Sequence, residues 1–273
     1  MKTISRLVLT FMILTGFCVS ASAALALDAY DEIKARGILI VGVNGTTPSF
    51  GNLDPRTNEI TGYDVDFAQA MAKRLSVKLE LKPILMEERI PYLLEGKADM
   101  IAATFTRNAE REKVIDFSYV YFYTGQKFLV RKGTVKAMAD LNGKRIGTTK
   151  GTTSEDNIKM ALKKVVVIYY DDFLSALAAL RQDKIFAVTT DESILASILS
   201  AAADKNLYEI PDLKISHEPY GLGVRKGNKK FLDFLNKSLL EMEKSGESKE
   251  IFNKWFGPDS PTPLKRPLMI TVE

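Results

Sequence analysis

The sequence predicts a two-lobed α/β protein in which each lobe is a mainly parallel sheet flanked by helices. Short apolar runs of strand length alternate along the chain with segments of helical periodicity, and the connections between them are short. After residue 125 the same alternation restarts, which indicates a second lobe. A length of 273 residues leaves room for one large domain or two modest ones with real cores.

Residues 1–26 have the pattern of a secretory signal peptide. Lys2 and Arg6 precede an apolar run over residues 7–19, and small residues at 21–26 form two overlapping cleavage patterns. The apolar run is shorter than the roughly 20 residues that a membrane span needs. Because removal of the leader takes its two cations away, the formal net charge falls from +4 to about +2. A net charge this small does not indicate binding to nucleic acid or to a membrane surface.

Cys18 is the only cysteine of the chain and lies within this leader. It could be the lipidated residue of a bacterial lipoprotein, but Phe17 just before it is a poor fit to the small residue that such a site needs. We therefore expect the mature chain to begin near Ala24 or Leu27 without a lipid anchor. It would hold no disulfide and would depend on its core for stability in an oxidising compartment.

The first predicted lobe covers residues 27–122. Gly37 closes its first helix, and Asp64 stands near the start of a helix whose apolar residues recur at helical spacing. Its strands are predicted from short apolar runs. The helices are expected at residues 28–37, 62–75 and 87–96, the strands at residues 38–43, 77–81 and 98–103, and a turn-rich connection at residues 51–61.

The second predicted lobe covers residues 123–219 and is identified in the same way. Its strands are expected at residues 126–130, 145–148, 165–169 and 185–189, its helices begin near Gly151, Asp172 and Asp191, and residues 211–219 are expected to be extended. A strand at residues 220–225 and helices at residues 228–244 and 248–256 complete the fold. The proline-rich tail, residues 258–273, is not expected to contribute to function.

One stretch places polar side chains where a strand gives way to a helix. Thr104, Thr106 and Arg111 lie between the strand at 98–103 and a helical turn at 108–113. Small ligands bind at this edge of an open α/β sheet. A guanidinium there can clamp a carboxylate, and the threonine hydroxyls can satisfy its remaining lone pairs. The stretch indicates a small anionic or zwitterionic ligand, although a solvated helical face with ordinary strand-end threonines has the same pattern.

Three further positions have both a ligand-binding and a structural interpretation. Thr153 stands at a helix N-terminus, where free N–H groups attract negative charge but where a plain N-cap is also common. Asp191 occupies another strand-to-helix edge, where its carboxylate can cap the helix, face a ligand ammonium, or do both. Phe50 follows a predicted strand and is either a platform for a ligand or a plug in the core.

The sequence contains no catalytic or metal-binding pattern. It has no Ser/His/Asp spacing, no phosphate-binding loop and no dinucleotide-binding glycine pattern after a strand. His217 is the only histidine and has no cysteine near it, so neither a metal role nor a cofactor is expected. A secreted, thiol-free chain with polar residues at its strand ends favours binding over chemistry.

Motifs along essentially the whole mature chain fall in the order and spacing of one known family. The longest is a helix signature that begins Gly-Tyr-Asp-Val-Asp-Phe at Gly62 and ends at Leu75. The others are Thr104-Phe-Thr106 with Arg111, Asp116-Phe-Ser118, Gly151-Thr-Thr-Ser154, Thr190-Asp191, Tyr220-Gly-Leu-Gly-Val-Arg-Lys226 and Trp255-Phe-Gly257. Together they make the chain resemble the bacterial extracellular solute-binding proteins, family 3, which are polar amino-acid binding partners of ABC transporters.

The resemblance implies a type II binding-protein fold, in which two lobes joined by a two-strand hinge close on a ligand. The hinge would comprise residues 121–125 and 218–221, and residues 220–257 would return to the first lobe. It further implies a periplasmic monomer that passes an amino acid to an ABC transporter permease in the inner membrane. Neither catalysis nor nucleic-acid binding is implied.

By the same resemblance, Arg111 would grip the ligand's α-carboxylate, assisted by Thr106 and the Thr153 region. Asp191 would hold the α-ammonium, and Phe50 would stack on the aliphatic part of the ligand. An amino-acid backbone indeed requires one guanidinium and one carboxylate, and placing them on opposite lobes makes binding favour the closed form.

The stretch that begins at Arg89 gives an indication of which ligand side chain is bound. It is similar to a stretch of the glutamate/aspartate-binding branch, in which the arginine faces a ligand side-chain carboxylate. Glu88 replaces that branch's asparagine, Asn44 or its neighbours stand where the branch has an arginine, and its second-lobe histidine is missing near residues 172–173. These departures favour the amides. We expect a C4 or C5 acidic amino acid or its amide, glutamate or glutamine first and aspartate or asparagine next.

Two other classes of function remain open. Some secreted members of this fold are similar to cyclohexadienyl or arogenate dehydratases, in which an acid in the cleft protonates a leaving hydroxyl. Glu155 or Glu192 would take that role here, but both are also ordinary first-turn helix acids. The third class is a sensory protein that feeds a separate receptor, since the chain ends at Glu273 without a second hydrophobic span.

Overall fold

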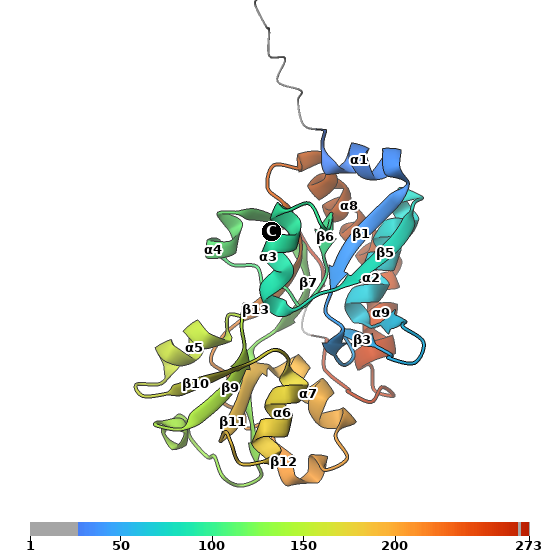
Figure 1. Ribbon diagram of the computed structural model, residues 1–273. Helices are drawn as coiled ribbons and strands as arrows, with labels where there is room; N and C mark the ends of the chain where they lie inside the picture. The colour runs from blue at the N-terminus through green and yellow to red at the C-terminus, as the bar shows by residue number, and fades with distance from the viewer. Residues whose placement is uncertain (1–26, 267–268, 273) are drawn as a thin grey trace, which may run out of the picture.

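The computed structural model describes residues 27–266 and 269–272, which form two α/β lobes stacked one above the other (Figure 1). The predicted signal peptide and Cys18 lie outside the described residues. Each lobe has a five-stranded mixed sheet with helices on both faces, so the predicted two-lobed α/β class is confirmed.

The sheet of the first lobe has the strand order β5-β1-β6-β13-β7. β1 pairs in parallel with β5 and β6, whereas β13 runs antiparallel between β6 and β7, so four strands share one direction. The strands are β1 (Ile38–Val43), β5 (Lys78–Pro83), β6 (Met100–Ile101), β7 (Ile115–Thr124) and β13 (Glu218–Arg225).

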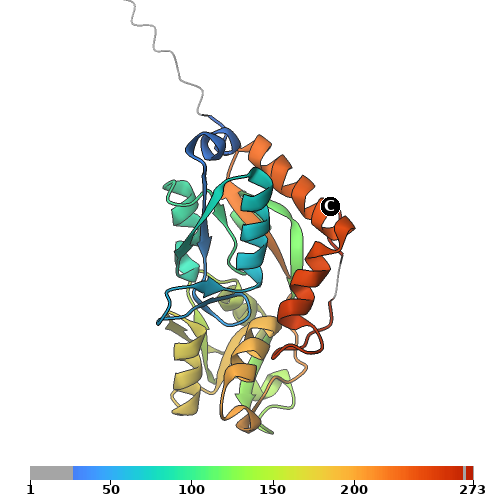
Figure 2. The same ribbon diagram turned by 90° about the vertical axis from the view of Figure 1, so that its right-hand side faces the viewer.

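Helices cover both faces of this sheet. One face carries α1 (Ala29–Arg36), α2 (Tyr63–Leu75), α8 (Lys229–Ser245) and α9 (Glu247–Phe256), which Figure 2 shows packed side by side. The other face carries the short turn η1 (Met86–Glu88) with α3 (Arg89–Leu94) and α4 (Ala109–Glu112). Apolar side chains fill both interfaces, because each helix turns its apolar residues toward the sheet.

The sheet of the second lobe has the order β10-β9-β11-β8-β12, in which only β8 runs against the others among the strands described. The strands are β8 (Gln126–Arg131), β9 (Arg145–Thr149), β10 (Val166–Tyr170), β11 (Ala187–Asp191) and β12 (Tyr208–Glu209). The helices are α5 (Ser154–Ala161), α6 (Phe173–Arg181) and α7 (Glu192–Ala201), with short turns η2 (Met138–Leu141) and η3 (Lys205–Leu207).

Two segments of chain cross between the lobes. Gly125 alone separates β7 of the first sheet from β8 of the second, and residues 210–217 lead from β12 into β13. The two crossings lie together because Thr124 pairs with Glu218 at the end of the β7–β13 ladder. The predicted hinge residues therefore fall at or beside the crossings.

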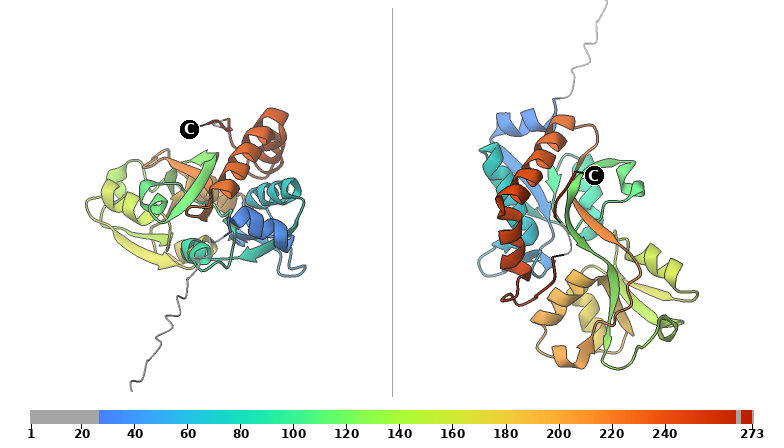
Figure 3. Two further views of the ribbon diagram at one scale, coloured as in Figure 1. Left: turned by 90° about the horizontal axis from the view of Figure 1, so that it is seen from above. Right: turned by 180° about the vertical axis from the view of Figure 1, so that it is seen from behind.

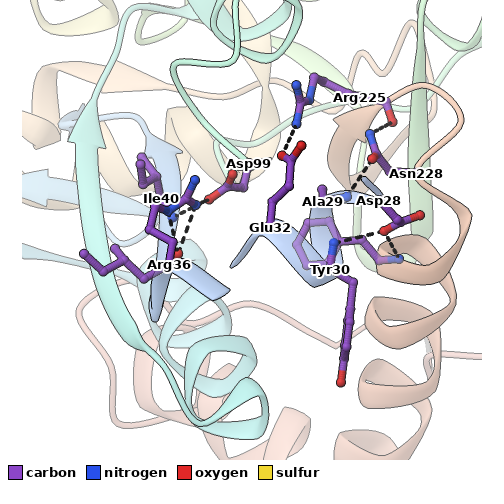
Figure 4. Close-up of polar contacts among 11 residues, drawn as sticks. Asp28, Ala29, Tyr30, Glu32, Arg36, Ile40, Asp99, Arg225 and Asn228 are labelled. Carbon is purple, nitrogen blue, oxygen red and sulfur yellow. Dashed lines mark hydrogen bonds and ion pairs between the residues drawn. The ribbon is translucent and has the colours of Figure 1, made fainter. Parts of the chain in front are cut away.

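The returning segment is tied to the start of the first lobe. The carboxylate of Asp28 accepts from the backbone N–H of Tyr30 at the start of α1 and from the backbone N–H groups of Lys230 and Phe231 at the start of α8. Ala29 donates its backbone N–H to Asn228 at 2.8 Å. Figure 4 shows this cluster beside the ion pairs Arg225–Glu32 and Arg36–Asp99, which join α1 to the sheet.

Two segments differ from the prediction. Residues 51–61, expected to be a turn-rich connection, contribute to a small antiparallel sheet of β2 (Thr46–Thr47), β3 (Gly51–Leu53) and β4 (Ile60–Thr61). The strand expected at 98–103 is shortened to β6, and the carboxylate of Asp99 just before it accepts the backbone N–H of Ile40 at 2.8 Å.

The C-terminal tail, for which the sequence predicted no packing, lies along the hinge. Ile270 is 4 % exposed and belongs to the main apolar core. Arg266 donates to Glu243 of α8 at 3.0 Å, and Thr262 shares a hydrogen bond of 2.7 Å with Ser200 of α7 in the second lobe. Figure 3 shows the tail beside the hinge strands. The tail therefore contacts both lobes, which the proline-rich sequence did not predict.

Candidate functional site

A small cavity lies between the two lobes. Six of the eight predicted site residues line it, and the other two, Asn44 and Phe50, do not. The first lobe contributes Met86, Arg89, Thr104, Thr106 and Arg111, and the second contributes Thr152, Thr153, Ser154, Phe173, Thr190, Asp191 and Ile194.

Arg111 supplies a buried cation at the first-lobe side of the cavity. Its side chain leaves the short helix α4, whose N-cap Asn108 accepts the backbone N–H of Arg111 at 2.9 Å. The guanidinium donates to the carbonyl of Thr106 at 2.6 Å and lies 4.8 Å from the ring centroid of Phe105. Burial lowers the pKa of Arg111 to about 10, so the group stays charged at neutral pH. Such a fixed cation suits a carboxylate.

Asp191 supplies a buried carboxylate at the second-lobe side. It ends β11 and stands at the N-cap position of α7, but its side chain makes no capping hydrogen bond. Instead the carboxylate accepts the hydroxyl of Tyr220 from the hinge strand β13. Burial, followed by the nearby charge of Glu218, raises the pKa of Asp191 to about 7. A ligand ammonium would restore the ionised form.

The threonines are placed by the backbone of the first lobe. Thr104 is buried in a left-handed conformation with φ of 44° and donates its N–H to Asp64 at 2.9 Å. Thr106 is also buried, and its backbone forms an isolated antiparallel β-bridge with Tyr220. Non-glycine residues adopt positive φ only where their surroundings hold them, so this loop is shaped by its hydrogen bonds.

These positions match a known family of proteins. The family model of the bacterial extracellular solute-binding proteins, family 3, covers residues 39–258 of the chain. The chain belongs to this family. Its relatives include the ABC transporter glutamine-binding protein GlnH of Bacillus subtilis, 35 % identical over 85 % of this chain and 86 % of the relative. The glutamine-binding protein of Geobacillus stearothermophilus is 37 % identical over 78 % of this chain and 82 % of the relative.

Solved structures agree with the family assignment. An ancestral arginine-binding protein bound to glutamine superposes with a TM-score of 0.77 at 40 % identity, covering 81 % of this chain and 99 % of the other. An ancestral amino acid-binding protein described as a precursor of cyclohexadienyl dehydratase gives a TM-score of 0.76 at 32 % identity, covering 84 % and 99 %. The protein is therefore an amino-acid ABC transporter substrate-binding protein with a type II fold.

The solute-binding protein places Asn44 and Phe50 away from its cavity. The side-chain oxygen of Asn44 accepts from Thr46 and Thr47, and its amide donates to Ile84, so it holds its own loop. Phe50 is fully buried among the rings of Tyr63, Phe122, Tyr220 and Phe256. Of its two interpretations, the structure supports the core plug. Met86, Phe173 and Ile194 provide the apolar lining instead.

Thr153 has a partner that sequence reasoning missed. Its hydroxyl donates to Glu218 at 2.8 Å, and the same carboxylate accepts from Asn157 at 2.8 Å and from Ser216 at 2.5 Å. Glu218 is only 2 % exposed. A glutamate before a proline in an extended segment normally reads as a surface residue, so no local signal distinguishes it. Only the fold brings it beside the cavity.

Within residues 27–266 and 269–272, no helix is long and apolar enough to cross a membrane. The same residues hold no group of three His, Cys, Asp or Glu side chains that could bind a metal ion.

Proposed function

We propose that this solute-binding protein captures a polar L-amino acid in the periplasm, L-glutamine first, and delivers it to the permease of an ABC importer. It would work as a monomer, without a cofactor, by closing its lobes on the ligand. The observation that carries the proposal is the pair Arg111 and Asp191, which line one cavity from opposite lobes. One cation and one anion match the two charges that every free amino acid shares.

The side chain of the ligand is argued from Arg89. It is 2 % exposed and makes four hydrogen bonds, all to main-chain carbonyls. Four of its five N–H donors are thereby used, so Arg89 cannot offer a second carboxylate the paired donors of a bidentate clamp. An amide needs no additional cation, which favours glutamine over glutamate and agrees with the names of the relatives from Bacillus subtilis and Geobacillus stearothermophilus.

A thermal-shift panel tests the proposal. The mature protein is unfolded, stripped of ligand and refolded, then heated with each of the twenty amino acids, L-cystine and prephenate. Cystine is included because the L-cystine-binding protein TcyJ of Escherichia coli is 33 % identical. A ligand at about a hundredfold its Kd adds about 2.7 kcal/mol, which corresponds to roughly 5–10 °C for a chain of this size.

The panel separates the candidate functions. A shift that is largest with glutamine supports the proposal, and one largest with glutamate shows that Arg89 does serve an acidic side chain. A shift with arginine or cystine keeps the transport function and changes the substrate. A flat amino-acid panel overturns the assignment of Arg111 and Asp191. Prephenate is also followed by its ring-diene absorbance, and loss of that absorbance would support the dehydratase alternative.

A further inference from the structure

The carbonyl of Gly151 is the point at which the second lobe is bound by both buried arginines of the first. Arg89 donates to this oxygen at 2.8 Å, and Arg111 donates to it at 2.9 Å. Gly151 follows β9 in the second lobe, whereas the arginines lie on α3 and α4 of the first. Hydrogen bonds from charged donors are stronger than neutral ones. One acceptor therefore joins two cations across the gap between the lobes.

The backbone around this carbonyl fits closely against the first lobe. Gly151 has a φ of +73°, and a Cβ atom added to it would lie 2.5 Å from the Cα of Glu87 and 2.7 Å from the backbone nitrogen of Glu87. These atoms belong to the backbone of η1 and cannot rotate away. A side chain at position 151 would hold the lobes apart, so glycine is required for this closed arrangement.

Arg89 is fixed in place for this contact by its own lobe. Its Nε donates to Met86, and one Nη donates to both Ala103 and Thr104, each within 3.0 Å. Its other Nη is the one that reaches Gly151. The lobe thus aims one donor of a rigid planar group across the gap, a geometry that a lysine cannot reproduce.

We propose that Arg89, Arg111 and the carbonyl of Gly151 form an interlobe latch that stabilises the closed form before and after the ligand binds. The inference rests on the proposed function in that the lobes open and close around a ligand. Arg111 serves the latch and the ligand, whereas Arg89 is a positioning residue that acts on the ligand only through lobe closure. Substrate affinity then depends on how far the latch favours the closed form.

Gly151→Ala is the test variant and Gly143→Ala is its control. Gly143 also has a φ of +73° in the second lobe, but a Cβ atom there would have nothing within 4 Å. Both variants therefore carry the same backbone strain, and only the first places a methyl group between the lobes. Their thermal stabilities should be similar, which separates the latch from a general loss of folding.

The distance between the lobes is measured directly with a pair of spin labels. Glu110→Cys on α4 and Met160→Cys on α5 place one label on each lobe, because both side chains are more than three-quarters exposed. The mature chain has no other cysteine, since Cys18 is the only one in the sequence. Figure 1 shows α4 and α5 on the same side of the molecule, one on each lobe.

The short interlobe distance should be more populated in the parent and in Gly143→Ala than in Gly151→Ala, both without ligand and with it. Ligand affinity of Gly151→Ala should fall about tenfold or more, mainly through faster release. Arg89→Lys should give the same two changes without altering the ranking of glutamine against glutamate. Equal distances and affinities in Gly151→Ala and Gly143→Ala would overturn the latch. A parent that binds no amino acid overturns the proposed function instead, while the unliganded distances still test the latch.

Discussion

At the scale of single residues, the site depends on two buried charges whose neighbours differ in kind. Arg111 is surrounded by carbonyl oxygens and the face of Phe105, which stabilise a cation. Asp191 has the hydroxyl of Tyr220 and the repulsive charge of Glu218, which make its ionised form costly until an ammonium arrives. Arg111 is therefore already charged in the free protein, whereas Asp191 becomes fully ionised only when the ligand ammonium binds.

Arg111→Ala should lower the affinity for every amino-acid ligand by roughly 2–5 kcal/mol, because it leaves a carboxylate buried without its cation. Isothermal titration with the ligand found in the panel measures the loss. Arg107→Ala is the matched control, since Arg107 lies in the same loop, pairs with Glu112 at 2.6 Å and does not line the cavity. If both variants bind alike, Arg111 is not the carboxylate clamp.

Ligand binding should strengthen as the pH rises toward 7. The pKa of Asp191 in the free protein is about 7, so below that pH a proton must leave before the ammonium is held. The apparent Kd for glutamine should therefore increase about tenfold for each pH unit below 7, since neither charge of the ligand backbone titrates there. Titrations between pH 5 and 8 measure this slope. Asp191→Asn should bind weakly with no such slope, and a parent profile that is equally flat would contradict the role.

At the same scale, the sequence predicts which residue types meet but not how each is oriented. Thr104, Thr106 and Arg111 line the cavity, and their position between a strand and a helix could be predicted because strand ends and helix starts can be recognised locally. Asn44 and Phe50 could not be oriented, because a loop side chain can turn toward its own backbone, toward the core or toward a ligand without changing the pattern. Glu218 was missed because burial of a charge depends on distant partners.

At the scale of elements, the family's helix signature does more than pack. Asp64, at the start of α2, is fully enclosed and accepts from the hydroxyl of Tyr121 at 2.6 Å and from the N–H of Thr104 at 2.9 Å. It therefore joins the helix to a hinge strand and to a cavity residue at once. The apolar spacing of α2 was predictable, but the inward direction of this carboxylate was not.

Asp64→Asn should change the pH dependence of stability. Burial raises the pKa of Asp64 from 3.8 to about 7, so between these values the folded protein holds a proton that the unfolded chain has lost. The contribution of this group to the free energy of unfolding therefore falls as the pH rises through that window, and asparagine has no such term. Urea denaturation at pH 5 and pH 8 should show the stability of Asp64→Asn, relative to the parent, improving at pH 8. An unchanged difference would show that Asp64 does not titrate there.

At the scale of the whole molecule, the two-lobed α/β class and the alternation of strands with helices could be predicted from the sequence. The course of the chain between the two lobes could not. The periodicity indicates strands at 126–130 and 220–225 without saying which sheet they join. Their partners are set by long-range pairing, such as β13 inserting between β6 and β7. Short elements such as β6 and the small sheet of β2, β3 and β4 were wrongly bounded for the same reason.

Deletion of residues 258–273 should destabilise the protein as a whole. The deletion removes the buried side chain of Ile270 and the pairing of Arg266 with Glu243, together worth roughly 2–4 kcal/mol. Urea denaturation of the parent and the shortened chain measures the difference. Ile270→Ser, which keeps the tail but removes its apolar contact, should give part of the loss. Identical stabilities would show that the tail is a passive extension.

The tail also adds a contact between the lobes outside the two chain crossings. Two neighbouring chain crossings at Gly125 and residues 210–217 act as a narrow ribbon, which can bend and can also twist about its own length. The contact of Thr262 with Ser200 of α7 adds a third connection between the lobes, separate from the two chain crossings. An off-axis tether resists torsion more than flexion. In the closure proposed above, this tether would favour bending of the hinge over twisting, so that Arg111 and Asp191 would meet in the same register each time the lobes close.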